Sequence, residues 1–206
     1  MGVSELSAVE RVRSYRKTYV AMLISSVLSL IASLVLSYDA IKLAAQPSSK
    51  LACDINAVVS CGKVAKSWQS NLLGFPNAFL GLMTEPVVIT IAIAGLSLVV
   101  FPKLFLKVAH VFYGLGLIFA LWLLSQSFFV IKAFCPWCLL VTVSTITVFS
   151  TLTRINLMEN TWGFSDERYK KIVGFLERGW GRVLYTAIYA ILALAIIIKY
   201  GNVIFA

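Results

Sequence analysis

Long apolar runs constrain this chain more strongly than any other feature. About 20 consecutive apolar residues let a helix cross the hydrocarbon core of a bilayer. Of the 206 residues, 60% are hydrophobic, whereas soluble domains have about 45 to 50%. We therefore expect an all-α integral membrane protein. The runs predict spanning helices at residues 18–37, 76–101, 104–131, 138–153 and 183–204.

The first run follows four basic residues and is a candidate for a cleaved signal peptide. It is longer than the apolar part of a signal peptide, and Tyr38-Asp39-Ala40 is a poor cleavage site. We therefore expect it to remain as a spanning helix, preceded by a cytoplasmic segment at residues 1–17.

The distribution of Lys and Arg predicts the orientation of the five helices. With a cytoplasmic N-terminus, 12 of the 18 basic residues fall in cytoplasmic segments or, in the case of Lys107, in the first turn of the span that follows one, as the positive-inside rule favours. Residues 154–182 mix charged and aromatic side chains and then form a linker along the cytoplasmic surface, and residues 183–206 form a fifth transmembrane helix. These flanking residues account for the net charge of +9, so the charge does not indicate a nucleic-acid partner.

Four cysteines form two spaced pairs beside apolar segments. Seven residues separate Cys53 from Cys61, and Cys135 and Cys138 form a C-x-x-C motif. A C-x-x-C bridge closes a small loop that gains little from cross-linking, so redox chemistry is favoured over a structural disulfide. A four-thiolate zinc site is a further alternative that the seven-residue gap disfavours, so we expect no metal. The predicted topology places both pairs on the outer side of the membrane, where disulfides persist.

The C-x-x-C motif is predicted at the start of the fourth spanning helix. Unpaired amide N–H groups at a helix start stabilise a thiolate, and Pro136 suits the first helical turn. This position makes Cys138 a plausible attacking or electron-donating group.

A series of spaced motifs joins the two cysteine pairs. In chain order they are Cys53-Asp54, Cys61, Ser67 six residues later, Pro76-Asn77-x-x-x-Gly81 and Cys135-Pro136-Trp137-Cys138. This series resembles the vitamin K epoxide reductase family, particularly its bacterial members, over about residues 18–153. The resemblance implies that residues 18–153 form a catalytic four-helix transmembrane bundle around a quinone site, with an outer cysteine loop at residues 38–75.

The resemblance also implies a role for each cysteine. Cys53 exchanges with a thiol-bearing partner, Cys61 attacks Cys135, and Cys138 faces the quinone. Exchange through mixed disulfides supports this order, because each transfer needs one accessible sulfur and one that reaches the next pair. We therefore expect an exposed loop pair that receives electrons.

Four residues are expected to contact the quinone. Asn77 matches a family asparagine whose amide hydrogen-bonds the quinone carbonyl, although it is also suited to cap a helix after Pro76. Thr142 stands where the family often has tyrosine and offers a shorter hydroxyl. Phe79 and Trp137 neighbour matched motif positions and are expected beside the ring. Asp54 and Ser67 are carried over as supporting residues.

Glu85 lies eight residues past Asn77, about 12 Å along the same predicted helix, and therefore inside the apolar layer. An intramembrane carboxyl is a functional candidate by default, and quinone reduction consumes protons. Proton relay and a hydrogen-bonded packing role beside the Pro86 kink both remain open. His110, the only histidine, is expected near the cytoplasmic end of the third span in a structural role.

These features predict a thiol-quinone oxidoreductase of a bacterial inner membrane. It would reoxidise a separate, extracytoplasmic thioredoxin-fold oxidase through a transient mixed disulfide and pass the electrons to menaquinone or ubiquinone. Many bacterial members of the family carry a fused thioredoxin-like domain after the fifth span, and we expect none here because the sequence stops at Ala206. The disulfide-bond formation protein B type does equivalent chemistry but has its C-x-x-C motif in the first outer loop. The alternative from another class is a non-catalytic membrane scaffold braced by two structural disulfides.

Overall fold

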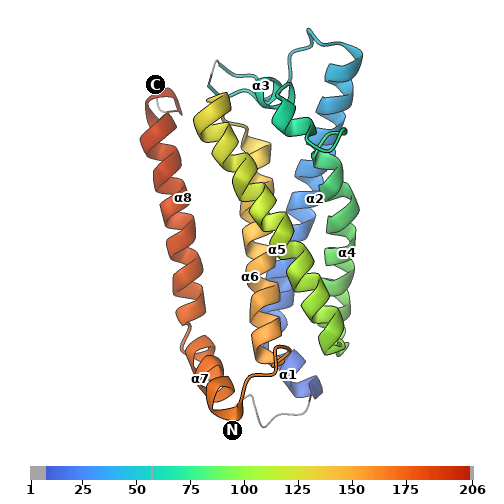
Figure 1. The fold of residues 1–206 in the computed structure, drawn as a ribbon, viewed down its shortest axis with the longest axis vertical. Helices are drawn as coiled ribbons and strands as arrows, with labels where there is room; N and C mark the ends of the chain where they lie inside the picture. The colour runs from blue at the N-terminus through green and yellow to red at the C-terminus, as the bar shows by residue number, and fades with distance from the viewer. Residues whose placement is uncertain (1–7, 57, 205–206) are drawn as a thin grey trace.

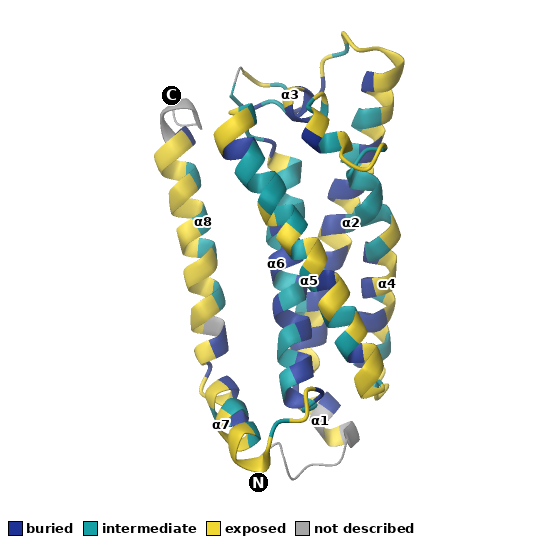
Figure 2. Cartoon of the chain, viewed as in Figure 1, coloured by how far each residue is buried: buried dark blue, intermediate teal, exposed yellow. Residues whose placement is uncertain are grey.

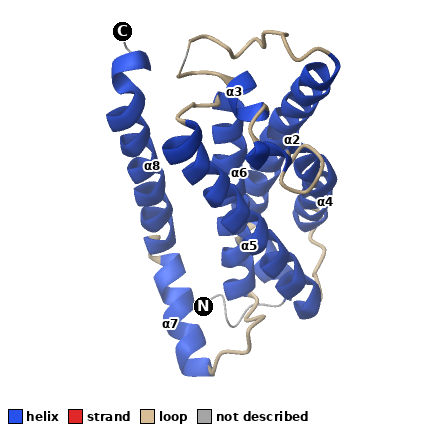
Figure 3. Cartoon of the chain, turned by 45° about the horizontal axis from the view of Figure 1, so that its top comes forward, coloured by secondary structure: helices blue, strands red, loops and turns tan. Residues whose placement is uncertain are grey.

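A computed structural model describes residues 8–56 and 58–204, and these residues form helices joined by loops, with no strand among them (Figure 3). The all-α prediction is confirmed. Short helices cover both ends of the molecule (Figure 1): α1 (Ala8–Ser14) and α7 (Asp166–Glu177) lie at one end, and α3 (Cys61–Ala65) lies at the other, followed along the chain by the 3₁₀ turn Trp68–Asn71.

Five helices are long and apolar enough to cross a membrane, as predicted. They are α2 (Arg16–Ala45), α4 (Ala78–Leu96), α5 (Lys103–Gln126) with its π-helical extension Ser127–Ile131, α6 (Pro136–Met158), and the segment Val183–Tyr200 of α8 (Trp180–Ile204). The chain is therefore a multi-pass membrane protein.

Two of these helices run further than their apolar cores predicted. Helix α2 continues through polar and charged residues to Ala45, because no Gly or Pro interrupts it before Pro47. The outer loop, expected to begin at residue 38, therefore starts with two more helical turns. Helix α6 likewise continues to Met158.

Four helices form the bundle. Helix α2 packs against both α4 and α6, and α6 packs against α5 (Figure 1). The contact between α2 and α4 is close because small residues meet there: Ser26, Ser29 and Ser33 are fully or almost fully buried, and a Cβ added to Gly81 would overlap the Ser33 hydroxyl. Small residues let membrane helices approach closely.

Helix α8 lies beside the bundle and is mostly exposed (Figure 2), as a lipid-facing span would be. Polar contacts of the described residues join it to the bundle. The Tyr189 hydroxyl lies 2.7 Å from that of Thr147 on α6, and Lys199 donates to the carbonyl of Phe128. Helix α7, expected within the linker, packs Val173 and Leu176 against the core of the bundle.

Candidate active site

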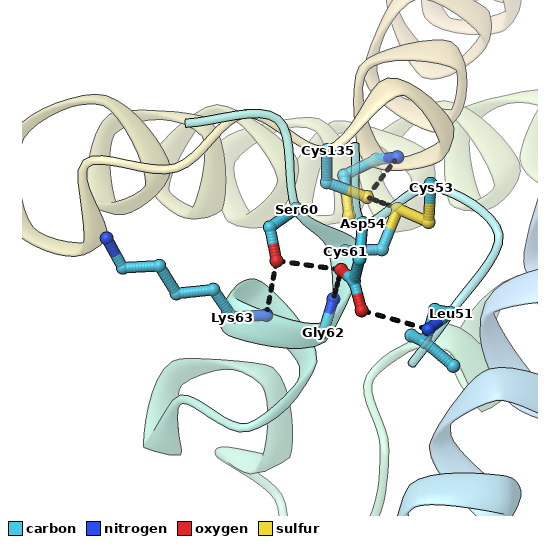
Figure 4. The surroundings of a disulfide bond; sticks show 9 residues. Leu51, Cys53, Asp54, Ser60, Cys61, Gly62, Lys63 and Cys135 are labelled. Carbon is cyan, nitrogen blue, oxygen red and sulfur yellow. Dashed lines mark hydrogen bonds between the residues drawn. A yellow bond between two sulfur atoms is a disulfide. The ribbon is translucent and has the colours of Figure 1, made fainter. Parts of the chain in front are cut away.

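The two cysteine pairs meet at one end of the bundle. Cys53 and Cys61 form a disulfide, whereas Cys135 and Cys138 are free thiols. The Cys135 sulfur lies 3.4 Å from the Cys61 sulfur (Figure 4). Residues 74 positions apart in the sequence are therefore in direct contact, and it is Cys61, rather than Cys53, that touches the second pair.

Backbone hydrogen bonds align the two cysteine segments. The Ser60 N–H donates to the carbonyl of Phe134 at 3.1 Å, and the Phe134 N–H donates to the carbonyl of Val58 at 2.6 Å. The residues immediately before Cys61 and Cys135 are thus held side by side. Ser60 also caps α3 by accepting a hydrogen bond from the Lys63 N–H, which fixes Cys61 at the first position of that helix.

Asp54 holds the loop on both sides of the disulfide (Figure 4). Its carboxylate accepts hydrogen bonds from the Leu51 N–H at 2.9 Å, the Ser60 hydroxyl at 2.7 Å and the Gly62 N–H at 2.8 Å. Burial alone would raise the pKa of Asp54, but these hydrogen bonds and nearby Lys66 lower it below its ordinary value. Asp54, expected only as a supporting residue, therefore fixes the loop in its ionised form.

Cys135 is the N-cap of α6. Its sulfur accepts a hydrogen bond from the Cys138 N–H at 3.3 Å, and Pro136 occupies the first turn. The hydrogen bond from the Cys138 thiol, followed by those from the Cys138 and Trp137 amides, lowers the pKa of Cys135 against the opposing effect of burial. The helix start therefore favours the thiolate of Cys135, whereas the sequence had suggested Cys138.

The loop pair is buried, so the expectation of an exposed pair was wrong. Cys53 is 8% exposed and Cys61 is 1% exposed. Leu43, Leu51 and Val64 pack around both sulfurs, because the outer end of α2 and the loop fold over them. Cys53 is therefore largely covered from solvent in this structure.

A cavity of about 540 Å³ lies inside the bundle, and Cys61, Cys135 and Cys138 form part of its wall. Cys53 is not among the residues that line it. Most of the wall is apolar and includes Leu36, Leu80, Leu115, Leu123, Leu139 and Val141. This is the kind of cavity that holds a small apolar ligand with a few polar contacts.

Two predicted quinone contacts lie in the wall of this cavity. Asn77 does not cap α4 with its side chain; its Nδ2 donates to the carbonyl of Gln69 at 2.6 Å, and its Oδ1 is buried without a partner. Thr142 also lines the cavity and donates to the carbonyl of Cys138 at 2.9 Å. Asn77 is therefore placed to accept a further hydrogen bond, and Thr142 keeps its oxygen lone pairs.

The two aromatic residues predicted beside the quinone ring lie outside the wall of this cavity. Neither Phe79 nor Trp137 is among the residues that line the cavity. Phe79 lies two positions past Asn77, which turns it about 200° around the helix, and it stacks on Phe75 instead. Trp137 packs against the buried cysteine cluster. The aromatic residues of the wall are Phe112, Tyr113, Phe119 and Phe134.

The remaining predicted residues divide between the loop and the bundle. Ser67 donates to the carbonyl of Val64 at 2.7 Å and supports the turn after α3. Glu85 is buried in the cavity wall and accepts hydrogen bonds from Ser29 and Tyr113. His110 stacks on Phe149 and lies 2.9 Å from the Thr153 hydroxyl, away from the thiols. The described residues contain no group of three or more side chains that could hold a metal ion.

Two contacting cysteine pairs beside an apolar cavity, within a bundle of membrane helices, define a membrane thiol-disulfide oxidoreductase. The chain belongs to the vitamin K epoxide reductase family, whose sequence pattern matches residues 20–153. Comparison with curated proteins finds no match. The family match covers the bundle α2, α4, α5 and α6 and all four cysteines, so the resemblance inferred from the cysteine spacing is confirmed.

Proposed function

We propose that this protein transfers electrons from a separate thioredoxin-fold disulfide-forming protein to a membrane quinone, and so generates disulfides outside the cytoplasm. The observation that carries the proposal is the 3.4 Å contact between the Cys61 and Cys135 sulfurs, combined with the position of Cys138 in the cavity wall. Together they give electrons a continuous route from the loop to the cavity.

The proposed exchange proceeds through mixed disulfides. A reduced partner dithiol reduces the Cys53–Cys61 bridge and leaves as a disulfide. The Cys61 thiolate then attacks Cys135 of an oxidised C-x-x-C pair, which releases Cys138. Attack of Cys53 on Cys61 restores the loop bridge and releases Cys135 as a thiol. One dithiol has been oxidised, and the two electrons and two protons now reside on Cys135 and Cys138.

The cavity supports a quinone as the final acceptor. Its apolar wall suits a ring with an isoprenoid tail, and Asn77 has a buried oxygen without a partner at that wall, suited to accept the hydroxyl of a hydroquinone. When a quinone is bound it takes two electrons and two protons, and the Cys135 and Cys138 thiols become a disulfide. Menaquinone and ubiquinone both fit this description.

The proposed setting is a bacterial inner membrane with the cysteines on the outer side. The loop disulfide supports an oxidising compartment, and the excess of Lys and Arg in segments 1–17, 102–103 and 154–182 supports a cytoplasmic location for the opposite end. The partner is a thioredoxin-fold oxidase, which is the kind of protein that presents one reactive thiol to a buried disulfide.

The test is quinone reduction by the detergent-purified protein with a reduced thioredoxin-fold donor. Cys138→Ala should abolish turnover with every donor. Cys53→Ala should abolish turnover with the protein donor and retain part of it with a small dithiol. Thr90→Val, at an exposed position of α4, is the matched control and should turn over like the wild type. Wild-type protein that reduces no quinone, with both cysteine pairs inert, would support the scaffold alternative instead.

A further inference from the structure

We infer that Glu85 donates a proton to the quinone carbonyl that lies away from Cys138. This inference rests on the proposed function and deepens it, because the quinone is the acceptor proposed above. Glu85 is 3% exposed and belongs to the cavity wall. Among the described residues that line the cavity, Glu85 has the one carboxyl group, and none of these residues is Lys, Arg or His. A buried carboxyl group without a neighbouring cation has a lower free energy in its protonated form than in its ionised form.

The two oxygens of the Glu85 carboxyl have different surroundings. Oε1 accepts hydrogen bonds from the Ser29 hydroxyl at 2.8 Å and the Tyr113 hydroxyl at 3.0 Å, from α2 and α5 respectively. Oε2 is buried and has no hydrogen-bond partner. With Oε1 occupied by two donors, the proton belongs on Oε2, where no other protein group competes for it. A buried polar atom without a partner is costly, and a bound quinone carbonyl would supply the missing acceptor.

The spacing along α4 fits a quinone ring between Asn77 and Glu85. Eight residues of helix separate them, which is about 12 Å. This rise between the two Cα atoms is of the same order as the length of a quinone ring with a hydrogen bond of about 2.8 Å at each carbonyl. Asn77 lies at the cysteine end of the cavity and Glu85 two turns deeper. The second N–H of Asn77 Nδ2, whose first donates to Gln69, would donate to one carbonyl, and the Glu85 acid would donate to the other.

Helix α6 offers a return route for the proton. Cys138, Thr142 and Thr145 recur at intervals of four and three residues, and all three line the cavity. Each threonine hydroxyl donates within its own helix, Thr142 to Cys138 and Thr145 to Val141, which leaves their oxygens free to accept. This polar face runs from the thiols to Thr145, which is a hydrogen-bond partner of the Tyr113 hydroxyl that donates to Glu85.

The step balances without an additional reagent. Oxidation of the Cys135 and Cys138 thiols to a disulfide releases two electrons and two protons. The quinone takes both electrons, one proton from the thiol side and one from Glu85. The second thiol proton then restores Glu85. The sum is one quinone and two thiols converted to one hydroquinone and one disulfide.

The test separates proton donation from a packing role. Glu85→Gln keeps an oxygen that accepts from Ser29 and Tyr113 but cannot transfer a proton. We expect it to lower kcat for quinone reduction by about 100-fold or more and to leave the quinone KM close to that of the wild type. The Ser29→Ala and Tyr113→Phe changes remove the partners of Oε1 and leave the acid in place, so each should lower kcat by less than tenfold. Thr90→Val is again the control.

A second measurement shows whether the variants are intact. Reduction of the four cysteines by the thiol donor, followed without quinone, should proceed in Glu85→Gln at the wild-type rate. If Glu85→Gln reduces quinone as fast as the wild type, or if Ser29→Ala and Tyr113→Phe are as harmful as Glu85→Gln, the carboxyl has a packing role and the inference is wrong, while the proposed function stands. Wild-type protein that exchanges thiols but reduces no quinone overturns both.

Discussion

Replacing Asp54 by Asn should loosen the loop that holds Cys61 against Cys135. The carboxylate accepts three hydrogen bonds, two at Oδ1 from Ser60 and Gly62 and one at Oδ2 from Leu51. Asparagine can keep the two at Oδ1, but its NH₂ group would face the Leu51 N–H, where two donors meet. One hydrogen bond is lost and the other two lose the assistance of the negative charge.

The magnitude follows from these three contacts. A hydrogen bond to a charged group contributes about 1.5–3 kcal/mol, and Asp54 is only half-buried, which reduces the effect of its charge. We therefore expect the closed loop to lose about 1–2 kcal/mol, which corresponds to a roughly 5- to 30-fold increase in the population of the open loop. Because Cys53 is 8% exposed in the closed loop, reduction of its disulfide should accelerate by the same factor.

The assay measures reduction of the loop disulfide by a small dithiol. Both cysteines of the C-x-x-C pair are replaced by Ala, so that the Cys53–Cys61 bridge alone reports. Asp166→Asn, at the start of α7 and at the opposite end of the molecule (Figure 1), is the matched control. In the four-cysteine protein the same Asp54→Asn change should slow transfer from the loop to Cys135, because Cys61 is held less firmly. Equal reduction rates for Asp54→Asn and the control would refute the reasoning.

Three further predictions follow from the geometry. A variant that keeps only Cys61 and Cys135 should form a disulfide between them under mild oxidation, since their sulfurs lie 3.4 Å apart; non-reducing electrophoresis after proteolysis would detect it, and its absence would contradict the proposed relay. The hydrogen bonds that lower the pKa of Asp54 below 3.8 stabilise the loop above that pH, and this stabilisation is lost as the pH falls through the folded-state pKa. A phosphine reductant should therefore cleave the loop disulfide faster in acid. An Asp54→Asn protein should lack this acceleration. Gly81→Ala should lower the free energy of unfolding by about 1–3 kcal/mol, and with it Tm, because its Cβ would overlap a serine of α2. Gly116→Ala, which has no atom within 4 Å of the new methyl group, should leave Tm unchanged. Equal Tm values would argue against close packing of α2 and α4.

The sequence predicted what depends on composition and spacing. Apolar length predicted five spans, because a bilayer imposes that length on any helix that crosses it. The spacing of the cysteines predicted two pairs that act together, and the Cys61 and Cys135 sulfurs lie in contact; the order of electron transfer inferred for them stays a prediction. These features are local, or are set by the membrane, and need no knowledge of packing.

The sequence did not predict features that depend on how separate helices face each other. Phe79 was expected at the cavity because it is near Asn77 in the sequence, but helical geometry turns it away. Phe112 and Phe119 of α5 do line the cavity, and their seven-residue spacing places them on one helix face. That spacing was available in the sequence, but nothing in it identified which face of α5 meets the cavity.

The burial of the loop pair indicates that the proposed relay has two opposing requirements. A disulfide open to every cellular thiol would lose electrons to side reactions, whereas a fully fixed one could not meet a partner. In this protein Asp54 and the cover formed by Leu43, Leu51 and Val64 keep Cys53 and Cys61 closed over Cys135, and the proposed internal transfer needs this arrangement. Exchange with a partner needs the opposite arrangement, with Cys53 uncovered. The stability of this one loop should therefore affect the two halves of the proposed reaction in opposite directions. A looser loop favours entry of electrons, and a tighter loop favours their passage to the cavity.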